Sequence, residues 1–196
     1  MNPKLWWYLA RATGLVAWGA AGVAIVVGLT LSGRLSRRPT PAWQLDLHRF
    51  LGGISVLFLA VHLIALSLDP TIAFGPAALA IPMASPWRPG AVAWGIVAAD
   101  ALIAVEVSSL FMTRIPKRVW RAIHFASYGV WITGTVHALQ AGSDSAIVRI
   151  VALGGSIVIV NLTVVRIVGR RIPRARSRVP AGAAIRTPVP HPSVGE

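Results

Sequence analysis

Long apolar runs without charge constrain this chain more than any other feature of its sequence. The clearest run covers residues 12–33, 22 positions with no Asp, Glu, Lys or Arg. About 20 apolar residues are enough for a helix to cross the hydrocarbon core of a bilayer. Only 13% of the residues are charged, about half the share in a soluble domain. We therefore expect an all-α integral membrane protein in contact with the lipid bilayer.

Four further segments have the length and composition of membrane spans. The five expected spans are residues 12–33, about 45–68, about 90–112, about 119–141 and about 146–168. The first is longer than the apolar core of a signal peptide, so we expect it to remain in the protein. The sequence thus predicts one domain, residues 1–169, built as a bundle of about five transmembrane helices.

Basic residues gather in alternate connections between these spans. The clusters lie at residues 34–38, 114–118 and 170–178, whereas residues 69–89 hold a single basic residue, Arg88. The formal net charge of +13 would suit nucleic acid, but short basic clusters between apolar runs indicate cytoplasmic loops, so no nucleic-acid partner is expected. We predict a multi-pass plasma-membrane protein with its N-terminus outside. Residues 170–196, basic and Pro-rich, are predicted to be a disordered cytoplasmic tail.

Four of the five histidines lie in only two of the expected spans. His48 and His62 are in residues 45–68, and His124 and His137 are in residues 119–141. Ionisable residues inside membrane helices are rare and usually functional. At a helical rise of 1.5 Å, the second histidine lies about 21 Å beyond the first in one span and about 19–20 Å in the other. Both spans run outward from a basic loop. We therefore expect His48 to pair with His124 near the cytoplasm, and His62 with His137 near the outside.

Two facing histidines can be the axial ligands of a six-coordinate haem iron, whereas zinc or non-haem iron needs three or four clustered ligands. The pattern predicts two b-type haems, and the absence of Cys excludes iron–sulfur ligation. Two other interpretations stay open, namely one haem with a second structural pair, or four histidines that only hydrogen-bond between helices. The 13-residue step from His124 to His137 turns the second histidine by about 140° around its helix. That helix must therefore be tilted or locally irregular, or it must approach the two haems from different sides.

Four short strings accompany this spacing. They are LARATG at 9–14, LHRFLG at 47–52, PMASPWRP at 82–89 and WRAIH at 120–124. With the paired histidines, they make residues 5–169 resemble the ferric-reductase-like transmembrane family. That family includes the membrane part of NADPH oxidases and the haem-binding subunit of the bacterial methionine-sulfoxide reductase system. The resemblance implies haem ligation by His48, His62, His124 and His137. It also implies electron transfer outward to ferric iron, oxygen or a periplasmic redox partner.

The expected function is transmembrane electron transfer by a ferric-reductase-like oxidoreductase component. Residues after the fifth span contain no Gly-rich phosphate loop, so a separate flavoprotein or membrane quinol is the expected electron donor. Whether the chain is itself an enzyme stays open. One alternative is a quinol-fed, haem-binding subunit of a separate periplasmic reductase. Another is a haem-free membrane anchor.

Three other polar residues in the apolar sequence have expected roles. Arg11 is expected to pair with Asp100 or with a haem propionate on the outer side, the simpler alternative being that it reaches the interface. Glu106 is expected either to carry protons during quinol oxidation or to hydrogen-bond a neighbouring helix. The apolar, Pro-rich residues 71–87 are expected to lie on the outer surface or to cover a site there.

Overall fold

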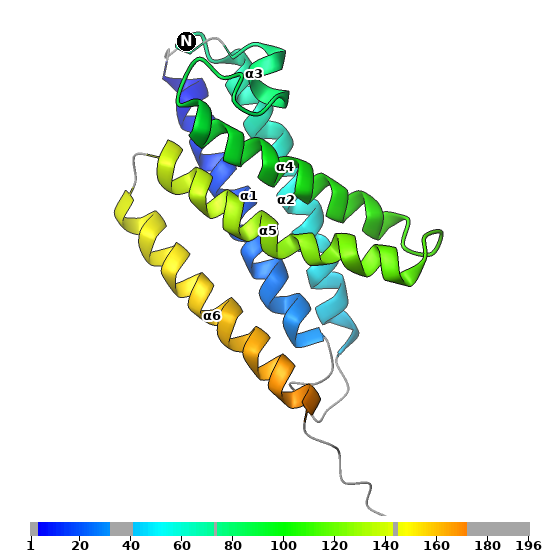
Figure 1. Cartoon of the computed structure of the whole chain (residues 1–196). Coiled ribbons are helices and arrows are strands. Elements are labelled where there is room, and N and C mark those ends of the chain that lie inside the picture. The colour runs from blue at the N-terminus through cyan, green and yellow to red at the C-terminus, as the bar shows by residue number, and fades with distance from the viewer. Residues whose placement is uncertain (1–3, 32–40, 73, 143–144, 172–196) are drawn as a thin grey trace, which may run out of the picture.

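The computed structural model describes residues 4–31, 41–72, 74–142 and 145–171, and all regular structure within these ranges is helical. The helices are α1 (Leu5–Leu31), α2 (Ala42–Leu68), α3 (Pro76–Ala80), α4 (Pro89–Leu110), α5 (Lys117–Ala141) and α6 (Ser145–Arg171). Five of them are long, and α3 is a single short turn of helix in the connection from α2 to α4 (Figure 1).

Four of the long helices have the length and hydropathy needed to cross a membrane. They are α1, α2, α4 and α6. This confirms the predicted fold class in its general form, an all-helical, multi-pass membrane protein. The predicted count of about five spans is not confirmed, because α5 does not meet the same hydropathy criterion. Helix α5 begins with basic residues, at Lys117, Arg118 and Arg121, and it carries two histidines.

The helix boundaries differ from the predicted spans mainly at the two ends of the chain. Helix α1 begins at Leu5, so the aromatic residues before the charge-free run and Arg11 belong to the helix. Helix α6 continues to Arg171, so the predicted domain boundary at 169/170 falls within its last turn. The tail beyond 171 lies outside the described residues, and its predicted disorder stays a prediction.

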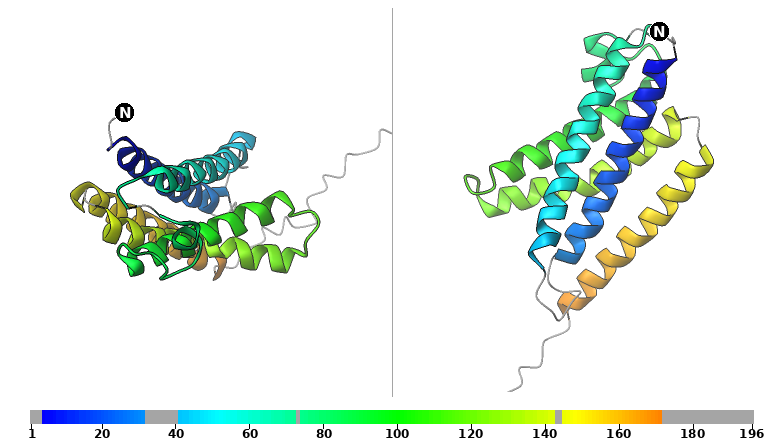
Figure 2. Two further views of the ribbon diagram at one scale, coloured as in Figure 1. Left: turned by 90° about the horizontal axis from the view of Figure 1, so that it is seen from above. Right: turned by 180° about the vertical axis from the view of Figure 1, so that it is seen from behind.

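The long helices form two antiparallel hairpins with α6 packed alongside. Helix α1 packs along α2 and α4 packs along α5, whereas the two hairpins touch each other over far fewer residues. The hairpin of α4 and α5 crosses the hairpin of α1 and α2 obliquely (Figure 2). Helix α6 lies against α1 and α5.

Trp131 of α5 holds the junction of α1, α5 and α6. Its ring packs on Ile25, Leu29 and Ile159, and its Nε1–H donates to the hydroxyl of Ser156 on α6 at 3.0 Å. Gly22 of α1 and Gly155 of α6 lie so close to the ring that a Cβ at either position would collide with it. Small residues therefore set how closely these three helices approach.

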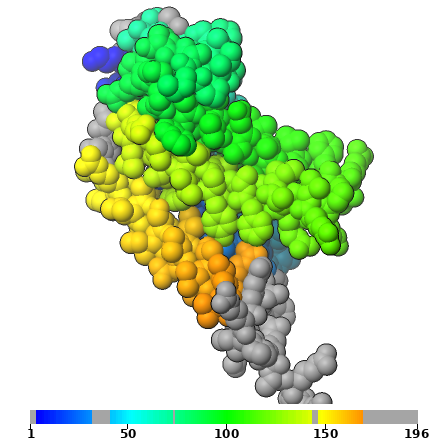
Figure 3. Space-filling model, viewed as in Figure 1, coloured from blue at the N-terminus to red at the C-terminus, as the bar shows by residue number. Residues whose placement is uncertain are grey.

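The connection between α2 and α4, residues 69–88, folds over one end of the bundle (Figure 3). Phe74 and Ala78 of this segment pack on Val92 and Ile96 of α4. Asp69 is fully buried, and its carboxylate accepts a hydrogen bond from the backbone N–H of Thr71 at 2.8 Å. We call residues 69–88 the cap, this end the capped end, and the opposite end, where α1 ends and α2 begins, the far end (Figure 1).

Candidate functional site

The four histidines of the long helices face one another in two pairs across the gap between the hairpins. The ring centres of His62 and His137 are 6.4 Å apart near the capped end, with an angle of 79° between the ring planes. Those of His48 and His124 are 6.0 Å apart nearer the far end, with an angle of 66°. These are the two pairs that the spacing predicts. Each pair takes one ring from α2 and one from α5.

Three of the four rings are held from behind by a main-chain carbonyl. The hydrogen bonds run from His62 to Ala10 (2.6 Å), from His48 to Ala24 (2.9 Å) and from His137 to Ala91 (2.8 Å). A carbonyl oxygen can only accept, so Nδ1 carries the proton in each ring. The other ring nitrogen, Nε2, is then left with a free lone pair in the neutral imidazole, which is the state that binds a metal ion.

A glycine accompanies each of these three carbonyls, four residues later on the same helix. A Cβ added at Gly14, Gly28 or Gly95 would lie 2.9 Å, 3.0 Å or 2.7 Å from the ring of His62, His48 or His137, respectively. The missing side chain lets the ring reach the carbonyl of the preceding turn. We call this carbonyl-and-glycine arrangement a glycine seat.

The glycine seats explain how α1 supports a histidine of α2 at each of the two depths. On α1 the two seats begin at Ala10 and Ala24, 14 residues apart, and the two histidines of α2 are also 14 residues apart. Because α1 and α2 are antiparallel, equal steps place each histidine beside its own seat.

The 13-residue step in α5 does not require a helix irregularity. Helix α5 is continuous from Lys117 to Ala141. The second hairpin instead crosses the first obliquely, so α5 meets α2 with different sides at the two levels (Figure 2). Of the explanations that the sequence left open, tilt and approach from different sides fit the structure.

His124 is held differently from the other three. Its Nδ1 lies 3.4 Å from the hydroxyl of Ser109 on α4, beyond the usual range of a hydrogen bond. Its ring stacks instead on Trp120, one turn earlier on the same helix, with ring centres 4.9 Å apart and an angle of 26°.

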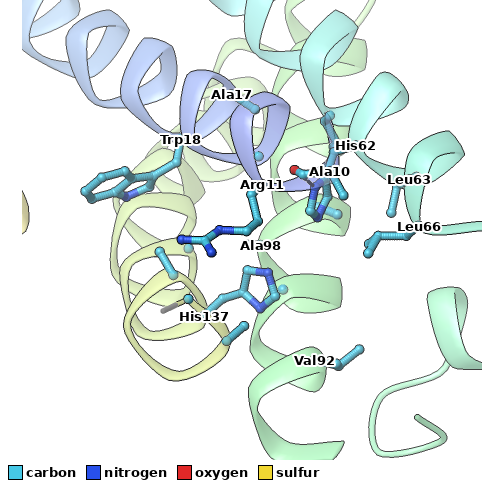
Figure 4. A pocket seen from close by; sticks show the side chains of 18 of the residues that line it. Ala10, Arg11, Ala17, Trp18, His62, Leu63, Leu66, Val92, Ala98 and His137 are labelled. Atoms are coloured by element: carbon cyan, nitrogen blue, oxygen red, sulfur yellow. Dashed lines mark hydrogen bonds between the residues drawn. The ribbon is translucent and has the colours of Figure 1, made fainter. Parts of the chain in front are cut away.

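A cavity of about 400 Å³ surrounds the pair at the capped end. Its walls are mostly apolar, and the cap supplies Phe74 and Trp87 to its lining. Arg11 also lines it, beside His137 and Trp18 (Figure 4), with its guanidinium 4.3 Å from the centre of the Trp7 ring. The segment 71–87, for which the sequence left two positions open, thus covers a site.

Arg88 closes the cavity at the junction of the cap and α4. Its guanidinium donates to the carbonyl oxygen of Gln140 near the C-terminus of α5, at 2.6 Å. Its backbone is left-handed, with φ of 41°, although the next residue is Pro89. Left-handed backbone is unfavourable for a non-glycine residue, and such strain gathers at sites where the surroundings require it. Arg88 thus joins the ends of α4 and α5 one turn from both His137 and its seat.

The two membrane carboxyls that the sequence singles out lie in different surroundings. The half-buried Glu106 of α4 packs against Gly52 of α2, where any side chain would collide with the carboxylate. Gly52 is one turn from His48, so Glu106 lies beside the far-end pair. Asp100 is exposed and does not line the cavity that contains Arg11.

The arrangement can present two ring nitrogens to one bound group at each level. Within the described ranges, no cluster of three or more His, Cys, Asp and Glu side chains is placed to hold a metal ion. A group that brings its own equatorial donors needs only two axial ligands from the chain.

The seats and the anchors at Ser109, Trp120 and Arg88 were not predicted from the sequence. The signal for the seats is present as an Ala-x-x-x-Gly repeat at 10–14, 24–28 and 91–95. Comparison with family models, curated proteins and solved structures finds no match to this chain.

Proposed function

We propose that this chain binds two b-type haems and conducts electrons across a membrane. His62 and His137 would ligate one haem, and His48 and His124 the other. Haem supplies a one-electron couple at each level, and the protein supplies axial ligation, burial and placement. The observation that carries the proposal is the pair of facing imidazoles at each of two depths, most of them fixed with Nε2 free.

The distances between the rings support this ligation. A bond from a metal ion to an imidazole nitrogen is about 2.0 Å, and the ring centre lies about 1.1 Å further, so two rings on opposite sides of one ion are roughly 6.2 Å apart. The measured separations are 6.4 Å and 6.0 Å. No large movement of either helix is needed to bring both nitrogens to an iron.

The chemistry of the cavity supports haem at the capped end. A volume of about 400 Å³ lies within the range of small-molecule sites, roughly 300–1,000 Å³. Its apolar walls suit a porphyrin ring. Arg11 and Arg88 also line it, and guanidinium groups are strong partners for carboxylates such as the two haem propionates.

The direction of transfer follows from the charge distribution. We propose that the far end faces the cytoplasm, because α1 and α6 end there and the basic clusters at 34–38 and 170–178 adjoin these helix ends in the sequence. The cap, whose single basic residue is Arg88, then faces outward across the plasma membrane. Helix α5 would be the fifth span, since its residues 122–139 contain no Asp, Glu, Lys or Arg. Electrons would enter near His48 and leave near His62.

One observation favours membrane quinol over a flavoprotein as the donor. Quinol oxidation releases protons, and the half-buried carboxyl of Glu106 lies beside the far-end pair. We expect Glu106→Gln to slow haem reduction by quinol while dithionite still reduces both haems fully. Equal rates of quinol-driven reduction in the variant and the parent protein would remove Glu106 from this role.

The experiment that tests the proposed function measures haem per chain in detergent-purified protein, with a reduced-minus-oxidised absorption spectrum. We expect two b-type haems. His62→Ala and His137→Ala should each remove the same haem, and the control His191→Ala, outside the described residues, should remove neither. A folded protein that takes up no haem when haem is supplied during expression would reject the proposal and favour the anchor.

A further inference from the structure

The four proposed ligands are not equally well held. His48, His62 and His137 each donate from Nδ1 to a main-chain carbonyl at 2.6–2.9 Å. The corresponding contact of His124, to the Ser109 hydroxyl, is 3.4 Å. That hydroxyl has one hydrogen, which it already donates to the carbonyl oxygen of Val105 at 2.7 Å. Ser109 can therefore only accept from His124, at a distance where the interaction is weak.

His124 also lacks a glycine seat. The neighbouring segment of α4, residues 105–110, contains no glycine, so no bare backbone receives the ring. Among the described residues, the ring stacks on Trp120 of its own helix. Its partner His48, by contrast, is fixed from behind by both Ala24 and Gly28 of α1.

Trp120 has a buried donor beside this loosely held ring. Its Nε1 atom is buried, and no residue in the described ranges accepts a hydrogen bond from it. Buried N–H groups are almost always paired, so this donor is available to an acceptor on a molecule bound beside it. This donor belongs to the ring that stacks on His124, with ring centres 4.9 Å apart.

We infer that His124 is an exchangeable ligand and that the far-end site binds a neutral diatomic gas in its place. The inference rests on the proposed haem ligation. The incoming molecule would take the place of the His124 Nε2 as ligand, and this replacement transfers no electron or proton. His48 keeps the haem in place, and the indole N–H of Trp120 donates to the far atom of the diatomic ligand. The capped-end pair, seated on both sides, does not exchange.

Carbon monoxide is a suitable probe, since it binds reduced haem iron and reports on nearby donors. In dithionite-reduced wild-type protein we expect CO to bind one haem of the two. Its affinity there should exceed that at the other haem by roughly tenfold or more. Two haems with no CO binding, or with equal binding at both, would overturn the inference and leave the proposed function standing. Protein without haem would remove the proposed function itself.

Single substitutions separate the two ligands of the far-end site. His124→Ala should keep two haems per chain and bind CO more readily, whereas His48→Ala should lose the far-end haem. At the capped end, His62→Ala and His137→Ala should behave alike, which makes that pair an internal control. Equal haem loss in His124→Ala and His48→Ala would overturn the inference.

Trp120→Phe tests the donor while keeping an aromatic ring on His124. Haem content should be unchanged. The infrared C–O stretch should move to higher frequency, because a donor to the oxygen weakens the C–O bond and the variant lacks it. An unchanged stretch would exclude Trp120 from the binding position.

Discussion

The glycine seat of His137 allows a sharp test of how the ligands are positioned. Gly95→Ala places a methyl group where a Cβ would be 2.7 Å from Nδ1 of His137 and 2.8 Å from its Cε1. Both are shorter than any ordinary contact of a Cβ atom, and the obstructing atoms belong to a rigid ring. The ring must therefore move away from α4.

The size of the effect follows from that movement. Restoring an ordinary contact of 3.4 Å needs a shift of about 0.7 Å, the difference from 2.7 Å. The hydrogen bond to Ala91, now 2.8 Å, is then stretched beyond its useful range, which costs about 1 kcal/mol. An off-rotamer imidazole adds about 0.5–1.5 kcal/mol. The higher helix propensity of Ala helps the haem-free and haem-bound states alike, so it cancels in binding. We expect haem affinity at the capped end to fall roughly 10- to 70-fold, equivalent to about 1.5–2.5 kcal/mol.

Haem titration of the haem-depleted protein, followed by absorbance, measures this change. Gly53→Ala is the matched control, because Gly53 is an exposed helical glycine with no side chain or backbone atom in the space a Cβ would fill. Gly14→Ala and Gly28→Ala, with closest approaches of 2.9 Å and 3.0 Å, should give smaller losses in that order. If Gly95→Ala binds haem as tightly as Gly53→Ala, the seat does not position the ligand.

Three further predictions concern the surroundings of the site. Arg88→Ala removes the hydrogen bond to the Gln140 carbonyl and a cation from the cavity wall, so the purified protein should lose the capped-end haem faster on dilution. Arg88→Lys should lose it at a rate between those of Arg88→Ala and the parent protein. Equal loss rates in all three would exclude this role. Trp131→Ala empties the α1–α5–α6 junction and should cost about 3–5 kcal/mol of stability, read as a lower thermal midpoint, compared with almost none for the exposed Trp43→Ala. The steep angles between paired ring planes, 66° and 79°, should give low-spin ferric signals dominated by one feature at large g in electron paramagnetic resonance; a spectrum typical of parallel ligand planes would contradict the ring geometry.

The sequence was sufficient for the features that depend on hydropathy and on spacing along one helix. The apolar runs predicted the long helices, and the steps of 14 and 13 residues predicted which histidines lie at equal depth. Arg11 lies within α1, as the sequence predicts, but its place in the cavity lining could not be read from the charge-free run at 12–33. A charge sets a boundary only if it faces lipid, and which way a side chain faces depends on the neighbouring helices.

Features created by contact between helices could not be predicted from one helix at a time. The Ala-x-x-x-Gly segments can be interpreted only when the histidine that packs on each one is known. The orientation of α5 at its two levels depends on how one hairpin crosses the other, which no periodicity within residues 117–141 records. The difference between His124 and the other ligands depends on a Ser109 hydroxyl that is already engaged by its own helix.

The support of each histidine comes from within its own hairpin, and this has a consequence for biogenesis. Ring, carbonyl and glycine of both sites on α2 are complete once α1 and α2 have inserted, before α5 has left the ribosome. The half formed by α4 and α5 is equally self-contained, and the two halves touch only lightly. Haem binding would therefore be the step that joins two hairpins that have already folded. Two separately expressed fragments, divided within the cap, should associate in the membrane when haem is supplied. Without haem they should stay separate.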